Sequence, residues 1–156
     1  MIDRYTRPRM SAIWDLQHKY EIWLEVELQA CAAFERGGQI PRGTSARIRK
    51  KAKIDVPRIA EIEKVTKHDV IAFLESLMDS VGPEHRFLHM GLTSSDIVDT
   101  SLAVQMTEAL DLILEDLNEL IAVLKNRALE PRPTVTVGRS HASHGEPASF
   151  GFESAI

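Results

Sequence analysis

The sequence predicts an all-α fold, with an N-terminal helical domain followed by the start of a long-helix bundle. Apolar residues recur at spacings of three and four along most of the 156 residues, which is the period of an amphipathic helix. Glycines and prolines stand between these stretches, where helices commonly stop or start. One stretch is far longer than an ordinary strand. We expect two domains, at residues 1–92 and 93–156.

Two helices are expected in the first third of the chain. The first spans about residues 11–36 and stops at Gly37 and Gly38, since glycine commonly follows a helix C-terminus. The second is a short basic helix from Thr44 to Lys53. Thr44 is its expected N-cap, because a threonine hydroxyl can accept a hydrogen bond from the first turn.

Two further helices are expected before residue 82. Asp55, followed by Val56 and Pro57, is a typical helix start. The stripe that this helix should bury consists of Ile59, Ile62 and Val65. The pattern slips near His68, and a new apolar stripe defines a helix that closes at Gly82 and Pro83; the members of this stripe are Val70, Phe73, Leu74, Leu77 and Met78.

The longest helix is expected over residues 93–129, which carry two overlapping apolar seams. A helix of this length extends about 50 Å, more than the width of a compact domain of this size. Two seams also need more than one neighbour. We therefore expect a bundle that is completed by other copies of the chain or by sequence outside it.

The last segment combines an extended stretch with a further helix. Residues 134–137 alternate threonine and valine, which favours extended backbone. Glu146 and Pro147 are typical of a helix start. An apolar pattern that begins at Phe150 and Phe152 reaches Ile156, so we expect the natural chain to continue.

Composition excludes several classes of protein. With 44% hydrophobic and 27% charged residues the chain is typical of globular proteins. Its apolar stretches are shorter than a bilayer span requires, its start does not resemble a secretory signal, and a net charge of −4 gives no electrostatic footprint for nucleic acid. We expect a cytoplasmic protein without membrane or nucleic-acid partners. Its single cysteine, Cys31, is expected in the core.

The basic residues are concentrated in one part of the chain. Nine lysines and arginines lie between Arg42 and Lys67, against three acidic residues. Such a run is usually a solvated helix face, and it can also attract an anionic ligand.

Three polar segments, residues 67–69, 89–96 and 138–147, carry candidate chemistry. Each borders an expected helix, where catalytic groups are often held. His68 and Asp69 can form a helix cap or an acid–base group, since the pKa of imidazole lies near neutrality. In Thr93-Ser94-Ser95-Asp96, hydroxyls and free N–H groups can cap a helix or bind an anion.

The third polar segment contains His141, His144 and Glu146. Two histidines three residues apart are a weak metal signal, because a third spaced ligand is missing. The arrangement favours instead a histidine presented to a polyanionic substrate, with Arg139 and Ser140 beside it. His85 is expected in an exposed turn.

Several separate motifs resemble the N-terminal third of adenylosuccinate lyases, members of the fumarase/aspartase superfamily of helical lyases. The resemblance covers essentially the whole chain and places the motifs in the same order. They are Arg4-Tyr5-Thr6-Arg7-Pro8, Trp23-Leu24-Glu25-Val26-Glu27, His68-Asp69-Val70, His89-Met90-Gly91-Leu92-Thr93-Ser94-Ser95-Asp96 and Gly138-Arg139-Ser140-His141. The resemblance implies a fold of the fumarase/aspartase type, truncated here.

The resemblance also implies an activity and a site. The family eliminates fumarate from adenylosuccinate, giving AMP, and from succinyl-aminoimidazole-carboxamide ribotide (SAICAR), giving AICAR, in purine nucleotide synthesis, without metal or organic cofactor. His141 matches the histidine assigned as a proton donor or acceptor, and His68 lies in the family's first histidine loop. We expect both to be catalytic, with His141 as the acid and His68 positioning substrate or sharing the proton. The positions that match substrate-binding residues are Arg4, Tyr5, Lys67, His68, Asp69, Thr93 and Ser94.

The resemblance has two departures. Ala142 and Gly145 exchange the small residues of the family's last motif, and a methyl at position 142 strains the backbone if φ there is positive. The family's base-bearing loop lies later in sequence, and its active sites are shared within a homotetramer. We therefore expect this segment alone to be inactive.

Two alternatives remain open. One is a metal-dependent phosphohydrolase of the helical HD type, with His68 and Asp69 as ligands completed by His18, His89 or Asp96. The other is a helical oligomerisation module without enzymatic activity, whose two seams serve only association.

Overall fold

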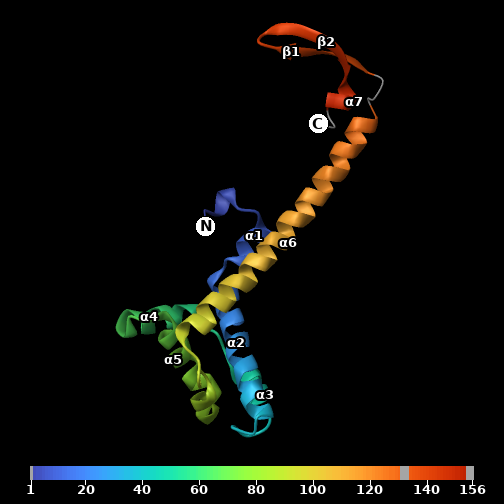
Figure 1. The fold of residues 1–156 in the computed structure, drawn as a ribbon. Helices are drawn as coiled ribbons and strands as arrows, with labels where there is room; N and C mark the ends of the chain where they lie inside the picture. The colour runs from blue at the N-terminus through green and yellow to red at the C-terminus, as the bar shows by residue number, and fades with distance from the viewer. Residues whose placement is uncertain (1, 131–133, 154–156) are drawn as a thin grey trace. The chain divides into compact units, whose positions relative to one another are not determined.

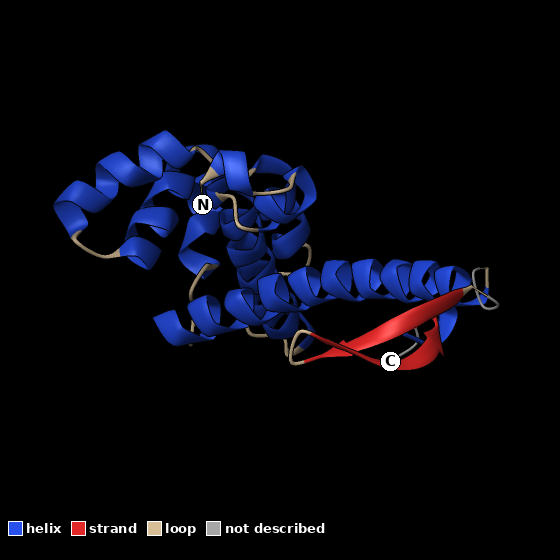
Figure 2. Cartoon of the chain, turned by 90° about the horizontal axis from the view of Figure 1, so that it is seen from above, coloured by secondary structure: helices blue, strands red, loops and turns tan. Residues whose placement is uncertain are grey.

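A computed structural model describes residues 2–130 and 134–153 of the chain. Helices make up most of it, and the described residues contain one two-stranded sheet (Figures 1 and 2). The residues form two compact units, 1–109 and 110–156, and the long helix α6 (Ser94–Leu129) contributes to both. The all-α prediction is confirmed. The domain boundary between residues 92 and 93 stays a prediction.

The first unit begins with η1 (Asp3–Tyr5), α1 (Pro8–Ile13) and α2 (Leu16–Arg36). The single helix predicted over residues 11–36 is wrong at its start, because the chain breaks at Trp14 and Asp15. The Asp15 carboxylate accepts a hydrogen bond from the Gln17 N–H at 2.8 Å and caps α2. The apolar periodicity continues through this break, which is why it was not visible from spacing.

The helix predicted from Thr44 is α3 (Thr44–Lys51), and its predicted cap is wrong. Gly43 is the N-cap, and the Thr44 hydroxyl donates to the Pro41 carbonyl at 2.6 Å. The carboxylate of Glu35 caps α3 instead, because it accepts from the Gly43 and Ser45 N–H groups.

The next two helices, α4 (Val56–Thr66) and α5 (Asp69–Val81), are confirmed. Asp55 caps α4, as predicted, by accepting from the Arg58 N–H at 2.9 Å. Ile59 is buried, whereas Val65 is 83% exposed, so the predicted inner stripe does not extend to the end of α4. His85, in η2 (Gly82–Phe87), is half-buried rather than fully on the surface, since its Nε2 lies 2.7 Å from the Leu74 carbonyl oxygen.

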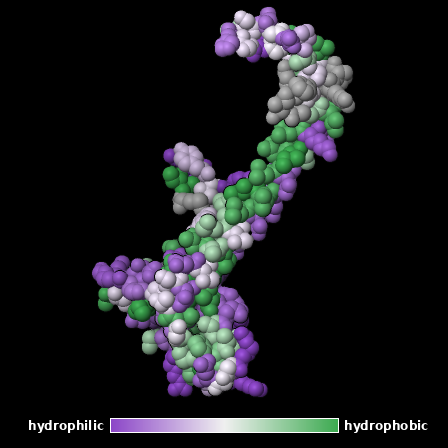
Figure 3. Space-filling model, in the orientation of Figure 1, coloured by the Kyte–Doolittle hydropathy of each residue, from purple (hydrophilic) through white to green (hydrophobic). Residues whose placement is uncertain are grey.

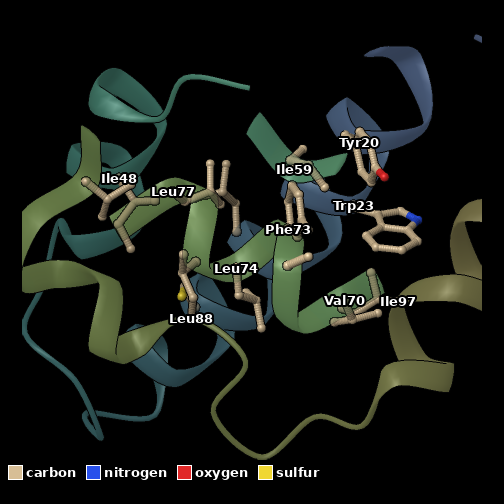
Figure 4. Close-up of a cluster of buried hydrophobic side chains, with 14 of the residues drawn as sticks. Tyr20, Trp23, Ile48, Ile59, Val70, Phe73, Leu74, Leu77, Leu88 and Ile97 are labelled. Carbon is tan, nitrogen blue, oxygen red and sulfur yellow. The ribbon is translucent and has the colours of Figure 1, made fainter. Parts of the chain in front are cut away.

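Three aromatic rings pack against one another in the core of the first unit (Figure 4). Tyr20 and Trp23 of α2 meet edge to face at 5.3 Å, and Phe73 of α5 stacks on Tyr20 at 5.7 Å. Such pairs stabilise a core beyond the area they bury. Cys31 is a buried member of the same core cluster, as predicted.

The start of α6 is fixed to the same core. Ile97 is fully buried, the Trp23 Nε1–H donates to the Ser101 hydroxyl at 2.8 Å, and the Gln105 amide donates to the Ile13 carbonyl at 2.6 Å. Buried polar groups need such partners, so these bonds set the position of α6 against α1 and α2. The hydrogen bonds of Ser101 and Gln105 therefore also position the first turn of α6.

Beyond Ala109, α6 exposes most of its apolar residues. Figure 3 shows a continuous hydrophobic surface along this helix. Its exposed members include Leu110, Ile113, Leu114, Leu117, Leu120, Ile121 and Leu124, at 45–62% exposure. The predicted length and seams of the helix are confirmed. None of the helices in the described residues has both the length and the apolarity that crossing a membrane requires.

The second unit contains the hairpin of β1 (Val135–Ser140) and β2 (Ser143–Ser149), followed by α7 (Phe150–Glu153). The predicted helix start at Glu146 and Pro147 is wrong, because Pro147 pairs with Val137 in the antiparallel sheet. The predicted extended stretch is confirmed for residues 135–137. Ile156 lies outside the described residues.

Candidate active site

Lys67 and His68 form the two-residue connection between α4 and α5. Lys67 has a left-handed backbone, with φ of 53°, and its N–H donates to the Glu63 carbonyl at the end of α4. His68 is the N-cap of α5, and its Nδ1 accepts from the Ile71 N–H at 3.5 Å. The predicted cap is confirmed. A neutral ring that accepts at Nδ1 carries its proton on Nε2.

The two predicted segments that contain His68 and Ser94 meet in space. The His68 Nε2 lies 3.4 Å from the hydroxyl oxygen of Ser94, the first residue of α6. In the tautomer whose Nδ1 accepts from the Ile71 N–H, the Nε2–H donates to this hydroxyl. The contact brings the N-terminal ends of α5 and α6 together, so two positive helix-dipole ends face the same region.

Asp69 and Thr93 flank this contact. The Asp69 carboxylate lies 3.5 Å from the His68 Nδ1 and accepts from the Val70 N–H. The Thr93 N–H donates to the Asp96 carboxylate at 2.8 Å, and the Asp96 N–H donates to the Thr93 carbonyl at 3.0 Å. This reciprocal pair caps α6, so the capping prediction for residues 93–96 is confirmed. Anion binding by the same segment stays a prediction.

Arg4 and Tyr5 lie in η1, where the Arg4 guanidinium stands 4.8 Å from the centre of the Tyr5 ring. Both side chains are exposed. Within residues 2–130 and 134–153 they make no hydrogen bond to His68 or Ser94. Their predicted role in binding substrate stays a prediction.

His141 stands at the tip of the β1–β2 hairpin in the second unit. Ser140 pairs with Ser143, so the turn consists of His141 and Ala142, with φ of 49° and 62°. A two-residue turn needs positive φ at both central positions when it is of type I′, which usually favours asparagine and glycine. The methyl of Ala142 therefore stands at a strained position. His141 is exposed.

The hairpin is irregular near its tip. Val137 pairs with Pro147, whereas Arg139 pairs with His144, so two residues of β2 lie opposite Gly138. A Cβ added at Gly145 would lie 3.2 Å from the Gly138 carbonyl oxygen. The bulge explains why glycine rather than alanine stands at position 145, where the backbones approach closely.

Backbone strain falls on the three predicted polar segments. The described residues contain four non-glycine positions with positive φ: Lys67, His89, His141 and Ala142. A non-glycine residue in this region costs about 1–3 kcal/mol and persists where surrounding contacts impose it, often at functional sites. This distribution supports the choice of each segment as a candidate for function.

Sequence reasoning missed Glu27, which holds the second polar segment. Its side chain is fully buried on α2. One carboxylate oxygen accepts from the His89 N–H at 2.6 Å, and the other lies 2.7 Å from the His89 Nδ1. The partners are 62 residues apart, and helical spacing alone could not reveal the pair.

The residues of the metal alternative are engaged elsewhere. His18 lies 2.7 Å from Glu108, and His89 is bound to Glu27. The Asp96 carboxylate accepts from Thr93. In the part of the chain that the structure describes, no three histidine, cysteine, aspartate or glutamate residues gather as a candidate metal site.

Comparison with known proteins decides the family. A family model described as a lyase matches residues 4–156. The chain belongs to this lyase family. It is 44% identical over 156 residues to adenylosuccinate lyase from Bacillus subtilis, with all of this chain and 36% of the relative covered. It is 48% identical over 155 residues to adenylosuccinate lyase from Synechocystis, with 99% of this chain and 36% of the relative covered.

Solved structures share the fold of this lyase chain. Fumarate lyase from Mesorhizobium matches with a TM-score of 0.86 and 26% identity, over 94% of this chain and 35% of that chain. A 3-carboxy-cis,cis-muconate lactonizing enzyme from Pseudomonas putida matches with a TM-score of 0.87 and 29% identity, over 99% and 37%. These similarities confirm the predicted fumarase/aspartase type of fold. The chain spans about a third of the length of the relatives it matches.

Proposed function

We propose that the whole protein to which this chain belongs is an adenylosuccinate lyase. It eliminates fumarate from adenylosuccinate to give AMP and from SAICAR to give AICAR. The observation that carries the proposal is the identity of 44% and 48% to adenylosuccinate lyases over essentially the whole chain. Because the chain spans 36% of each relative, the activity is proposed for the whole protein and we expect this segment alone to be inactive.

The reaction is a β-elimination that needs an acid, a base and anion-binding groups. A base removes a proton from carbon, the electron pair of that C–H bond becomes the new C=C bond, and the C–N bond breaks with its pair going to nitrogen. An acid then protonates the departing nitrogen. Donors that stabilise the negative charge developing on the succinyl group lower the barrier.

We assign the acid to His141. It stands at a hairpin tip with positive φ, and such an exposed imidazole can approach a bound substrate. His68 binds substrate or shares the proton, and its Nε2–H faces the Ser94 hydroxyl. The base is expected in a later segment of the protein.

The anionic groups of the substrate would be bound around the junction of α5 and α6. Two helix N-termini meet there through the 3.4 Å contact between His68 and Ser94, and N–H groups at such ends attract carboxylates and phosphates. Lys67 adds a cation, and Thr93 and Ser94 add hydroxyl donors. Asp69 and the N-terminal pair Arg4 and Tyr5 complete the proposed binding set.

We also propose that the protein is a homotetramer with shared active sites. The support is the exposed apolar surface of α6 beyond Ala109. Large contiguous apolar surfaces usually mark an interface, and long helices of this kind pack into bundles. No organic cofactor or metal is part of the proposal, and a cytoplasmic location stays a prediction.

The proposal is tested by following fumarate release from adenylosuccinate with the full-length protein. We expect turnover without added metal, and unchanged turnover after chelator treatment. A folded full-length protein that releases no fumarate from either succinylated substrate would refute the assignment. Retention of wild-type turnover by both His68→Ala and His141→Ala would favour the oligomerisation module for this region instead.

A further inference from the structure

The loop between η2 and α6 is fixed at both ends and strained between them. Leu88 is buried, and Leu92 packs against the same core. Between them, His89 and Gly91 have positive φ of 59° and 70°. A Cβ added at Gly91 would lie 3.3 Å from the Phe34 ring. These features restrict the conformation of the loop that leads to Thr93 and Ser94.

Glu27 binds the loop at His89, the residue with a strained backbone. Both carboxylate oxygens are used by His89, one by the backbone N–H at 2.6 Å and the other by the ring Nδ1 at 2.7 Å. The carboxylate is fully buried, whereas the His89 side chain is 20% exposed. Burying a carboxylate is costly unless it is paired, and both contacts are short enough for charge-assisted hydrogen bonds.

Stability alone does not account for a buried pair of this kind. A buried ion pair can often be replaced by apolar residues without loss of stability, whereas removal of one partner is costly. Glu27 also orients His89, because its two hydrogen bonds fix both the backbone and the ring of that residue. Five residues later the chain reaches Ser94, whose hydroxyl meets His68.

We propose that Glu27 is a positioning residue for the substrate-binding hydroxyl of Ser94. It acts through His89 and the loop that follows, and its carboxylate also accepts from the Nδ1–H of the His89 ring. This inference rests on the proposed lyase function, because it concerns the same site. Because Glu27 is fully buried, its proposed effect passes through His89 and not through direct contact with substrate.

The test uses Glu27→Gln in the full-length protein. The amide keeps the shape of the side chain and can still accept from the His89 N–H. Its NH2 group then faces Nδ1, so the ring must shift its proton to Nε2 or move away. We expect kcat/KM for fumarate release to fall about 10- to 100-fold, because small misplacements of a binding group are costly.

A double-mutant cycle separates positioning from general destabilisation. If Glu27 acts through Ser94, Glu27→Gln should change kcat/KM no more than about twofold when Ser94 is already alanine. Equal factors in both backgrounds, or a Ser94→Ala protein with wild-type kcat/KM, would overturn the proposal.

Glu25→Gln is the matched control. Glu25 lies two residues before Glu27 on α2 and bonds to Arg49 and Gln29 on the surface. It should leave kcat/KM at the wild-type value. If the wild-type protein is active and Glu27→Gln is as active as Glu25→Gln, this inference alone is overturned. If the wild-type protein is itself inactive, the proposed function is overturned.

A second variant decides the matter if Glu27→Gln does not fold. Gly91→Ala perturbs the same loop through its positive φ and the Phe34 ring, without leaving a buried polar atom unpaired. It should lower kcat/KM in the wild-type background and have little further effect in Ser94→Ala. Independent effects of Gly91→Ala and Ser94→Ala would contradict the proposal.

Discussion

The imidazole Nε2 of His68 lies 3.4 Å from the Ser94 hydroxyl, while the Nδ1 of the same ring accepts from the Ile71 N–H. One nitrogen therefore caps α5 and the other faces the start of α6. The two functions of His68, in folding and in the proposed site, can be separated because they use different atoms.

His68→Asn should keep the fold and lose the activity. The asparagine side-chain oxygen can still cap α5, since asparagine is a preferred N-cap, but it has no nitrogen that reaches Ser94 in the same way. We expect an unchanged thermal midpoint and a loss in kcat/KM of about 100-fold or more, as for a lost acid–base group. Fumarate release and thermal unfolding are the measurements. Activity near wild type would remove His68 from the proposed chemistry.

Ala142→Gly should stabilise the turn that carries His141. Alanine at φ of 62° pays about 1–2 kcal/mol that glycine avoids, partly offset by the greater freedom of glycine in the unfolded chain. Hydrogen exchange of the β1 and β2 amides should slow. Gly145→Ala is the opposing variant, because its Cβ would lie 3.2 Å from the Gly138 carbonyl oxygen; it should speed exchange. Equal exchange in both variants would contradict the described bulge.

Cys31 should be inert in the folded protein. Burial, together with the negative charges of Glu27 and Glu35, raises the pKa of its thiol to about 11. Since the thiolate is the reactive form, an aromatic disulfide reagent at pH 8 should modify Cys31 only after denaturation. Rapid modification of the native protein would show that the core around α2 opens readily.

The raised pKa of the Cys31 thiol predicts that the folded protein loses stability at alkaline pH. Its pKa is higher in the folded than in the unfolded state. Its contribution to the free energy of unfolding is therefore fully present below the pKa of the unfolded state and is lost as pH rises from about 9 towards 11. The pKa of Tyr20 is also raised, mainly by burial, and acts in the same direction. Denaturant midpoints of wild type and Cys31→Ala should therefore converge or cross as pH rises. Parallel pH dependence would contradict the assignment to Cys31.

Leu117→Asp should weaken assembly of the full-length protein. Leu117 is 46% exposed on the apolar surface of α6, and a buried charge at an interface is costly. Light scattering after size-exclusion chromatography should show smaller species than for wild type. Glu119→Gln, on the polar side of α6, is the control. An unchanged mass for Leu117→Asp would mean that this part of α6 does not form the interface.

Local signals predicted much of the fold. Asp55 followed by Val56 and Pro57 predicted α4 because capping depends on neighbouring residues, and the two seams predicted α6 almost to the residue. The errors have two causes, namely pairing between strands and a local cap that apolar spacing does not reveal. Pro147 lies in a strand because Val137 pairs with it, and the break at Asp15 depends on a cap that does not interrupt the apolar spacing.

The segments of the candidate site could be predicted from local sequence, but the contacts between them could not. The residues of the three polar segments were visible because small polar residues and histidines bordered helices. The contact of His68 with Ser94 and the support of His89 by Glu27 join positions 26 and 62 residues apart. Such pairs depend on how α2, α5 and α6 pack, and no periodicity within one helix records them.

The central proposal is that the whole protein is an adenylosuccinate lyase in which His141 is the acid. The most direct measurement is fumarate release from adenylosuccinate by the full-length protein and by its His141→Ala variant at neutral pH. We predict turnover by wild type and a loss of at least about 100-fold in kcat for His141→Ala, with the same thermal midpoint. Equal turnover by the two proteins would contradict the account.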